Sequence, residues 1–297
     1  MTLDDEVTPA WPVRMPRLGW DRLARRREGR VERLVHVGGH PVLLRAWQAG
    51  RNVRLRAESR DAAAAEAGMV RARFWTAVDD DLRPFADRFG ADPVIGPSLR
   101  AVPDLRPDRR PMPFEALMWA VCEQLITGER ATAIQRRIVG RHGRRDPATG
   151  MRDAPGAASV ARLAPAQLRS CDLSAGRATA LIRAAREVAS GRVDLLDADR
   201  HAAGHARLRA IPGIGTWTIA CLGLHGQGDP DALPSGDLAY RVLVGQVRGG
   251  RPGAGAATEA EVDAFFLPYA GWRALAGAHM LRMGGPAVRR ALMGAAA

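Results

Sequence analysis

The residues best suited to chemistry lie between Leu208 and Arg241, where a glycine-containing turn precedes a single carboxylate. Pro212 cannot continue the helical pattern before it, and Gly213 and Gly215 supply positive-φ geometry and allow close approach of another backbone. A turn without side chains can present its N–H groups to a phosphate. Asp237 lies further along the chain, at the start of the next helical pattern. This pairing predicts a turn that binds a phosphate and a carboxylate that serves as an active-site acid.

The chain is strongly basic, and all of its basic residues are arginine. Its 297 residues include 44 basic and 32 acidic side chains, which gives a formal net charge of +12, and they include no lysine. Such a surplus suits a polyanionic partner, because arginines that neutralise phosphates release condensed counterions. A GC-rich genome would explain the missing lysine but not the net surplus. The composition therefore favours a polyanionic partner.

The cysteines and the hydropathy pattern exclude other classes of protein. The chain has only three cysteines, Cys122, Cys171 and Cys221, and they are far apart in sequence. They cannot supply the four thiolates of an iron–sulfur cluster, so no such cofactor is expected. Unpaired cysteines are typical of a reducing compartment rather than of a disulfide framework. The acidic N-terminus lacks an apolar core, and no run of about 18 apolar residues follows it. We expect a soluble, cytoplasmic monomer with no membrane partner.

Two kinds of periodicity precede residue 90. The segment Leu34 to Glu58 alternates apolar and charged side chains around Gly38 and Gly39, which predicts a small antiparallel sheet with a hairpin. The segment Arg60 to Gly90 has a helical period, with an apolar stripe that runs through Val70. These helices are expected to cover one face of the sheet.

Beyond this part, the pattern becomes almost entirely helical. The proline- and arginine-rich stretch Ala91 to Pro113 predicts a mostly extended connection. Phe114 to Thr127 and Thr179 to Val188 each carry an apolar stripe, and the first of these stripes includes Leu125. We expect both stripes to pack in a helical core.

The shift in composition at the extended stretch sets the predicted domain boundary. We predict an α+β domain with its linker over residues 1–110 and an all-helical domain over residues 111–297. The segment Gly249 to Ala257, rich in glycine and alanine, is expected to form a loop in the second domain.

Three segments resemble one known superfamily. Ile211 to Thr218, IPGIGTWT, resembles the helix-hairpin-helix of the base-excision DNA glycosylases, and Leu233 to Leu238, LPSGDL, is similar to the segment with their catalytic aspartate. Pro113 to Thr127 also follows the family's helical bundle. The bare hairpin occurs in polymerases, ligases and helicase accessory domains as well, so the aspartate makes the resemblance specific. Within this superfamily, the chain most resembles the 3-methyladenine DNA glycosylase II family.

The resemblance implies a fold and a base pocket. It implies a small N-terminal antiparallel sheet with helices, followed by a helix-hairpin-helix glycosylase bundle, with Asp237 as the catalytic acid and Trp217 in the pocket. An indole can stack on a methylated base, although a tryptophan there could also pack the hairpin. Cys221 and Leu281 stand where the family has further pocket aromatics, and Tyr240 is a weaker pocket candidate. Alternatively, Asp237 could be an acid that only stabilises the N-terminus of the helix that follows it.

The resemblance also implies the contacts with DNA. Leu125 matches the wedge that fills the gap left by an extruded base, with Gln124 next to the unpaired partner base; alternatively, Leu125 continues the core stripe. N–H groups of Gly213 and Gly215 would face a phosphate, supported by the Thr218 hydroxyl. In the family, three carbonyls of the hairpin hold a monovalent cation, Na⁺ or K⁺, and here they belong to Arg209, Ile211 and Ile214.

The implied reaction is hydrolysis of the N-glycosidic bond of alkylated purines in duplex DNA by base flipping. A fixed carboxylate stabilises the positive charge that develops on the sugar, so no catalytic cofactor is needed. Without a lysine to form a Schiff base, the enzyme should be monofunctional and leave an abasic site. Two alternatives remain open: a non-catalytic DNA lesion-binding protein, and a glycosylase for oxidised or deaminated bases.

Overall fold

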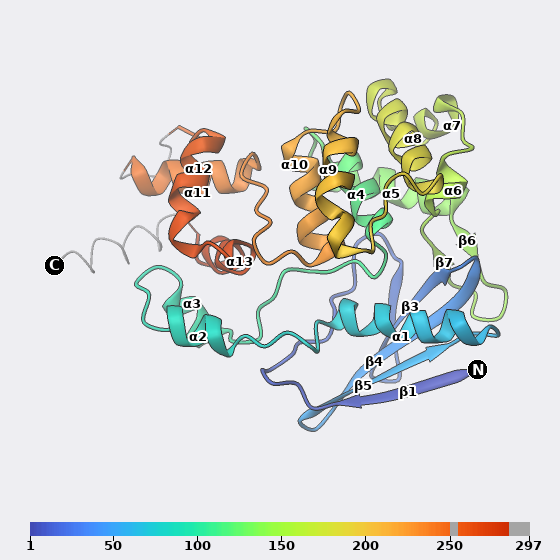
Figure 1. Ribbon diagram of the computed structural model, residues 1–297, viewed down its shortest axis with the longest axis horizontal. Coiled ribbons are helices and arrows are strands. Elements are labelled where there is room, and N and C mark those ends of the chain that lie inside the picture. The colour runs from blue at the N-terminus through green and yellow to red at the C-terminus, as the bar shows by residue number, and fades with distance from the viewer. Residues whose placement is uncertain (250–254, 285–297) are drawn as a thin grey trace. The chain divides into compact units, whose positions relative to one another are not determined.

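The computed structural model describes residues 1–249 and 255–284, which fall into two compact units (Figure 1). Unit 1 comprises residues 1–9, 15–79 and 108–227; unit 2 comprises residues 10–14, 80–107 and the chain from Gly228 onward. The fold is α+β, as predicted, but the compact units do not follow the division at residue 110, which stays a prediction. The expected loop Gly249 to Ala257 lies mostly outside the described residues.

The sheet of unit 1 is antiparallel and has five strands in the order β1-β5-β4-β3-β2. The hairpin between β3 and β4 is the predicted one, with Gly38 and Gly39 at φ 58° and 90°. Leu34 pairs with Leu43, and Leu44 pairs with Ala57. Because Leu43 and Leu44 are consecutive, the two pairs lie on opposite faces of the sheet, and all four residues are buried. The strands are β1 Thr2–Val7, β2 Ala24–Arg27, β3 Arg30–Val37, β4 His40–Ala49 and β5 Asn52–Glu58.

The edge strand β1 was not predicted from the sequence. Its outward side chains pair across the sheet: Arg56 Nε lies 2.6 Å from Asp4 Oδ1, and Arg54 Nε lies 3.0 Å from Glu6 Oε2. The sequence of β1 lacks the apolar run by which strands are recognised. The strand is held instead by its pairing with β5 and by these ion pairs, whose partners lie far away in the sequence.

The helix α1 (Ala62–Thr76) covers one face of this sheet, as expected (Figure 1). It approaches β4 so closely that a Cβ at Gly68 would lie 2.5 Å from Val42 Cγ1. Its buried face includes Ala72 and Trp75, whereas Val70 is 53% exposed, so the predicted stripe through Val70 was wrong. Apart from Trp75, small side chains mark the buried face, because they allow helix and sheet to approach.

The remaining helices of unit 1 form an apolar core around α4, which is buried along almost its whole length. Two short strands, β6 (Arg144–Arg145) and β7 (Arg152–Asp153), interrupt the helices. The π-helical segment Leu222–Gln227 continues directly from α10. The helices are α4 Pro113–Glu123, α5 Gly128–His142, α6 Ala157–Val160, α7 Pro165–Arg169, α8 Ala175–Ala189, the 3-10 turn Ala198–Arg200, α9 His201–Arg209 and α10 Thr216–Cys221.

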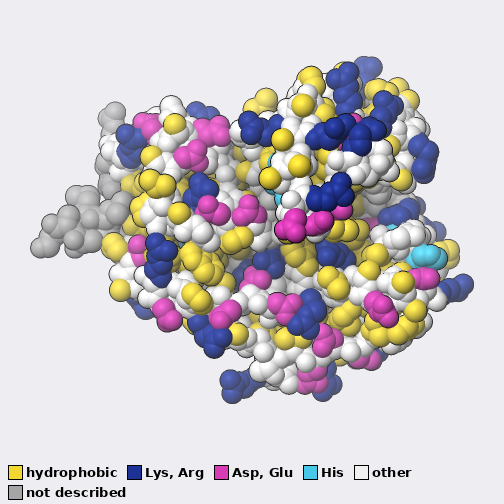
Figure 2. Space-filling view, viewed as in Figure 1, with side chains coloured by type: hydrophobic (Ala, Val, Ile, Leu, Met, Phe, Trp, Pro, Cys, Tyr) yellow, Lys and Arg dark blue, Asp and Glu magenta, His cyan; other side chains and the backbone are white. Residues whose placement is uncertain are grey.

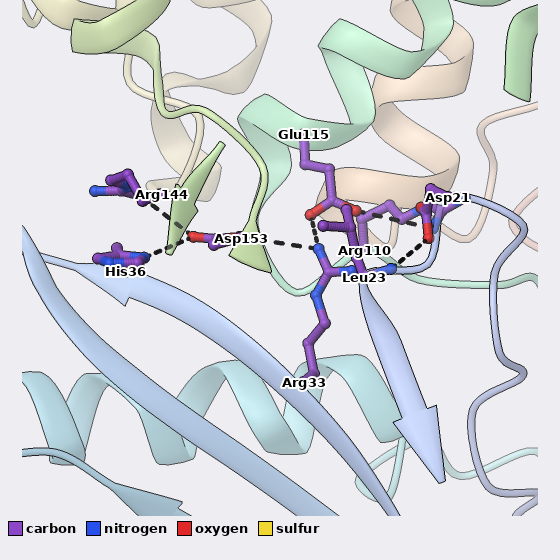
Figure 3. Close-up of polar contacts among 8 residues, drawn as sticks. All are labelled: Asp21, Leu23, Arg33, His36, Arg110, Glu115, Arg144 and Asp153. Atoms are coloured by element: carbon purple, nitrogen blue, oxygen red, sulfur yellow. Dashed lines mark hydrogen bonds and ion pairs between the residues drawn. The ribbon is translucent and has the colours of Figure 1, made fainter. Parts of the chain in front are cut away.

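A buried cluster of charged side chains fastens the sheet to the helices of unit 1 (Figure 3). Arg33 on β3 pairs with Glu115 on α4, and both side chains are almost fully buried. His36 Nδ1 on the same strand lies 3.1 Å from Asp153 Oδ2 on β7. Removing one partner of such a pair would leave an uncompensated buried charge, so the cluster fixes how the sheet meets α4. Its other charged members are Asp21, Arg110 and Arg144.

Unit 2 has its own core, built around aromatic side chains such as Phe85 and Phe266. The stretch Ala91 to Pro113, predicted to be extended, contains the helix α3, so the prediction was wrong there. Pro97 stands in the first turn of α3, where its missing N–H leaves no helical bond unmade. The helices are α2 Arg83–Phe89, α3 Gly96–Ala101, α11 Leu238–Arg248, α12 Glu259–Phe266, the 3-10 turn Leu267–Tyr269 and α13 Arg273–Met283.

The fully buried His279 in unit 2 should make the stability of the protein depend on pH. Burial, reinforced by Arg282, lowers the pKa of His279 from 6.5 to about 4, and Nδ1 lies 2.9 Å from Ser98 Oγ. The unfolded chain therefore takes up a proton below pH 6.5 that the folded protein refuses until about pH 4, so stability is lost as the pH falls through this window. We expect the free energy of unfolding to drop by about 2 kcal/mol between pH 7 and pH 5.

Denaturant unfolding at the two pH values measures this drop, with His279→Phe as the comparison variant. Phenylalanine can keep the stacking on Phe85, whose ring centroid lies 5.9 Å from that of His279, but it cannot titrate. An unchanged pH dependence in His279→Phe would show that other groups cause it.

Candidate functional site

The hairpin predicted from the glycines joins α9 to α10 in unit 1. Within its turn, Ile211 N–H donates to the Leu208 carbonyl and Ile214 N–H to the Ile211 carbonyl, both at 3.0 Å. Gly213 has φ 92°, and a Cβ there would lie 3.3 Å from Ala180 Cβ on α8. Both the backbone conformation and the close approach therefore favour glycine at this position.

Gly215 differs from the prediction. Its φ of −99° and ψ of −174° are extended, so the positive φ expected for it was wrong. No atom lies within 4 Å of a Cβ built on Gly215, and the residue is exposed. Gly215 therefore leaves the backbone at the start of α10 exposed. Its predicted contact with a phosphate stays a prediction.

Gln124 ties the end of α4 to the hairpin. Its Nε2 donates to the Gly213 carbonyl at 2.8 Å and to the Thr218 hydroxyl at 2.9 Å. Thr218 is 1% exposed, so its hydroxyl supports the hairpin from inside, and its predicted contact with a phosphate stays a prediction. Both N–H groups of the Gln124 amide are engaged here, so a contact with a partner base that keeps these bonds must use Gln124 Oε1 as an acceptor.

Leu125 has a strained backbone conformation and an exposed side chain. It follows the end of α4 with φ 54°, in the left-handed region that costs a branched residue about 1–2 kcal/mol. Its side chain is 104% exposed, so the alternative that Leu125 continues the core stripe was wrong. A strained, exposed leucine gains nothing in stability from its position, which directs attention to function. The wedge role stays a prediction.

Arg177 on α8 holds the loop that carries Leu125. Its Nη1 donates to the Cys122 carbonyl at 2.9 Å and lies 3.3 Å from the Gln124 carbonyl. On the other side of the loop, Thr127 is the N-cap of α5. The loop is therefore fixed at both ends while Leu125 projects from it. The interactions of Arg177 and Gln124 were missed by sequence reasoning, because they join residues far apart in the chain.

Trp217 and Cys221 lie on α10 with different exposure. Cys221 is 6% exposed and belongs to the packing of this helix, whereas Trp217, in the first turn, is only partly buried. The helix and the π-helical segment after it pack against α4, where a Cβ at Gly226 would lie 2.9 Å from Ala116 Cβ. Trp217 is thus presented on a helix that the core holds in place.

Asp237 is the N-cap of α11 in unit 2. Its Oδ1 accepts a hydrogen bond from Ala239 N–H at 2.8 Å, and its side chain is partly exposed. This bond satisfies one of the N–H groups that the first turn of the helix leaves unpaired. The structure thus places this acid at the N-cap of α11, immediately before the first helical turn. Its catalytic role stays a prediction.

The segment before Asp237 is anchored by residues that the sequence did not single out. Ser235, which is 6% exposed, donates its hydroxyl hydrogen to Asp263 on α12. Asp237 N–H then donates to the Pro234 carbonyl at 2.8 Å, which closes a tight turn. Because this turn sets the backbone at Asp237, Ser235 and Asp263 position the acid.

The other two pocket candidates also lie in unit 2, in different surroundings. Tyr240 is 5% exposed and packs edge-on against Phe266, with a ring-centroid distance of 5.7 Å. A Cβ at Gly277 would lie 2.7 Å from the Tyr240 hydroxyl, so the tyrosine fills space against α13. Leu281, near the end of α13, is 40% exposed. Tyr240 is therefore a core residue, and Leu281 is accessible at the surface of its unit.

The described residues contain no group of three or more histidine, cysteine, aspartate and glutamate side chains suited to holding a metal. Nor does any helix among them combine the length and the apolar character that a membrane span requires. Basic side chains gather over α7, α8 and α9, on the helical part of unit 1 (Figure 2).

Known proteins resemble this chain in sequence and in fold. No family model matches it. It is 26% identical over 221 residues to the DNA-3-methyladenine glycosylase of Bacillus subtilis, covering 70% of this chain and 69% of the relative. It is 28% identical over 173 residues to a probable bifunctional transcriptional activator/DNA repair enzyme AlkA of Mycobacterium tuberculosis, covering 56% of this chain and 33% of the relative.

The fold also matches that of a solved protein over almost the whole chain. The 3-methyladenine DNA-glycosylase of Archaeoglobus fulgidus aligns with a TM-score of 0.70 at 18% identity, over 93% of this chain and 96% of that protein. The sequence relatives, this fold and the hairpin followed by an aspartate at a helix start all agree. The chain is therefore similar in sequence to DNA-3-methyladenine glycosylases and shares its fold with a solved 3-methyladenine DNA-glycosylase.

Proposed function

We propose that this protein is a monofunctional DNA glycosylase that removes alkylated purines from duplex DNA, acting as a monomer in the cytoplasm. The observation that carries the proposal is Asp237, a carboxylate fixed at the start of α11 by its own cap and by the Ser235 anchor. A protein that only clamps DNA has no use for an acid near phosphates. Hydrolysis of an N-glycosidic bond needs such an acid to stabilise the positive charge on the sugar.

Asp237 acts on the sugar. As the bond to the base breaks, positive charge develops on the deoxyribose, and a fixed carboxylate stabilises this transition state more than the neutral ground state. The bond from Ala239 N–H holds the carboxylate at the N-terminus of α11. An alkylated base that already carries positive charge departs as a neutral molecule, so no second catalytic acid is required. Asp237 can also orient the attacking water.

Leu125 and Trp217 act on the bases. Leu125 fills the gap left when the damaged base leaves the stack and so offsets part of an unstacking cost of a few kcal/mol. Trp217 stacks on the extruded base through dispersion and, for a methylated base, cation–π attraction. Cys221 and Leu281 stand where the family has further pocket aromatics, so the pocket of this protein has fewer aromatic walls than that of the family.

The hairpin offers a donor set that fits an alkali cation. Backbone carbonyls are neutral oxygen ligands, which suit a hard monovalent ion, and the candidates are those of Arg209, Ile211 and Ile214. The Ile211 carbonyl already accepts the Ile214 N–H at 3.0 Å and keeps a second lone pair. When bound there, Na⁺ or K⁺ would add positive charge at the end of the hairpin that faces a phosphate. The residues themselves supply the turn and its free backbone groups.

The test of this proposal is base release from defined lesions. We expect the protein to release 3-methyladenine from methylated duplex DNA, and to leave alkali-labile sites without cutting the strand, because the chain has no lysine to form a Schiff base. Chromatography of free bases and gel analysis with and without alkali measure the two outcomes.

Duplexes with 8-oxoguanine, uracil or hypoxanthine serve as controls for substrate class. Release from those duplexes but not from methylated DNA would reassign the protein to oxidised or deaminated bases. Tight binding to methylated DNA without release of any base would make it a lesion-binding protein.

A further inference from the structure

We propose that an arginine pocket beside the Leu125 loop binds a backbone phosphate of the DNA, and that Asp172 competes with this phosphate for the arginines. The pocket has a volume of about 520 Å³ and lies in unit 1 between α5, α7 and α8. Its polar lining consists of Arg130, Arg169, Arg177, Asp172, Ser170 and Ser174. The inference rests on the proposed function, in that it takes DNA as the partner.

The chemistry of the lining fits a phosphate. Three guanidinium groups surround the pocket against a single carboxylate. Arg169 is exposed and has no ion-pair partner among the described residues, so its charge is available to a ligand. Guanidinium groups pair with phosphate oxygens through two parallel hydrogen bonds, which favours phosphate over a simple anion.

The position of the pocket favours a phosphate of DNA rather than a free ion. Arg177 is shared: its Nε lies 3.1 Å from Ser174 Oγ at the pocket, while its Nη1 donates to the Cys122 carbonyl beneath the Leu125 loop. Arg130 stands in the first turn of α5, directly after the same loop. A strand that meets Leu125 therefore passes the mouth of the pocket, and the exposed lining can receive a phosphate within a polymer.

Asp172 occupies the arginines in the absence of DNA. Its carboxylate contacts Arg130 at 3.2 and 3.3 Å and Arg137 at 3.5 Å. These arginines hold the pKa of Asp172 below its usual range, so it is charged at neutral pH. An incoming phosphate must share or displace these bonds and meets the charge of the carboxylate. Asp172 thus weakens DNA binding at this pocket.

Two variants test the pocket with effects of opposite sign. Arg169→Ala removes one phosphate contact, so we expect about fivefold weaker binding and a salt dependence of log K reduced by about 1. Asp172→Asn releases Arg130 and Arg137, so we expect binding to become about fivefold tighter and more salt-dependent. Asparagine suits the backbone here, because Asp172 has φ 74° and asparagine adopts this conformation readily.

The measurement is fluorescence anisotropy of a duplex with an abasic-site analogue, titrated with the full chain between 50 and 200 mM NaCl. Arg51→Ala is the matched control, because Arg51 is an exposed arginine in the β4–β5 turn of the same unit. If Arg169→Ala behaves like Arg51→Ala, or if Asp172→Asn binds more weakly than wild type, the proposal is overturned.

Inorganic phosphate separates the two sources of the ligand. If phosphate at constant ionic strength stabilises the wild type against heat but not Arg169→Ala, and the DNA affinities of Arg169→Ala and Arg51→Ala agree, the pocket binds free phosphate and the DNA proposal fails. Anisotropy does not depend on base release. A wild type that releases no base therefore refutes the proposed function, while the two opposed shifts in affinity would still support the pocket.

Discussion

Asp237→Asn should lower the single-turnover rate of base release by about 10³-fold, because it removes a charge that stabilises the transition state more than the ground state. Asparagine caps a helix as well as aspartate does, so the bond from Ala239 N–H and the start of α11 should be kept. The Kd for duplex DNA should stay the same or fall, since a negative charge is lost near phosphates. Single-turnover kinetics at saturating protein and anisotropy titrations measure the two quantities.

Asp61→Asn is the matched control for this variant. Asp61 caps α1 in the same way, with Oδ1 accepting from Ala64 N–H at 2.8 Å, but it belongs to the sheet-covering helix of unit 1. It should leave base release unchanged. Full excision by Asp237→Asn would show that another group supports the departure of the base, and the assignment of the acid would be wrong.

The parts of the fold that could be predicted are those whose signal is local. The β3–β4 hairpin follows from apolar alternation around Gly38 and Gly39, and α8 follows from its helical period. The edge strand β1 and the helix α3 could not be predicted in this way. Ion pairs with β5 stabilise β1, and packing with α13 stabilises α3, so in both cases the stabilising partner lies far away in the sequence.

The candidate site shows the same division. The turn at Gly213 and the helix start at Asp237 could be predicted, because proline, glycine and capping residues act on their own backbone. The bond from Gln124 to the hairpin and the Ser235–Asp263 contact join separate segments, and no local pattern indicates them. The resemblance identified the functional positions, but it did not say which side chains hold them in place.

The strained backbone at Leu125 bears directly on its role. A leucine at φ 54° with no packing contacts would be replaced by glycine without loss if stability were all that mattered. Relief of strain in Leu125→Gly and the greater flexibility of unfolded glycine offset one another, so the free energy of unfolding should change by less than about 1 kcal/mol. Any large effect of this variant on base release therefore reports on function.

Leu125→Gly should slow base release about 10²-fold from a lesion paired within a duplex, because nothing then fills the gap in the stack. The same lesion in single-stranded DNA needs no such filling, so its release should slow by no more than about threefold. Single-turnover rates on the two substrates measure the ratio, and Leu196→Gly, at another leucine that is 57% exposed, is the control. Equal losses on both substrates would mean that Leu125 orders its loop instead of filling the stack, since only a wedge depends on whether the base must be pulled out of a helix.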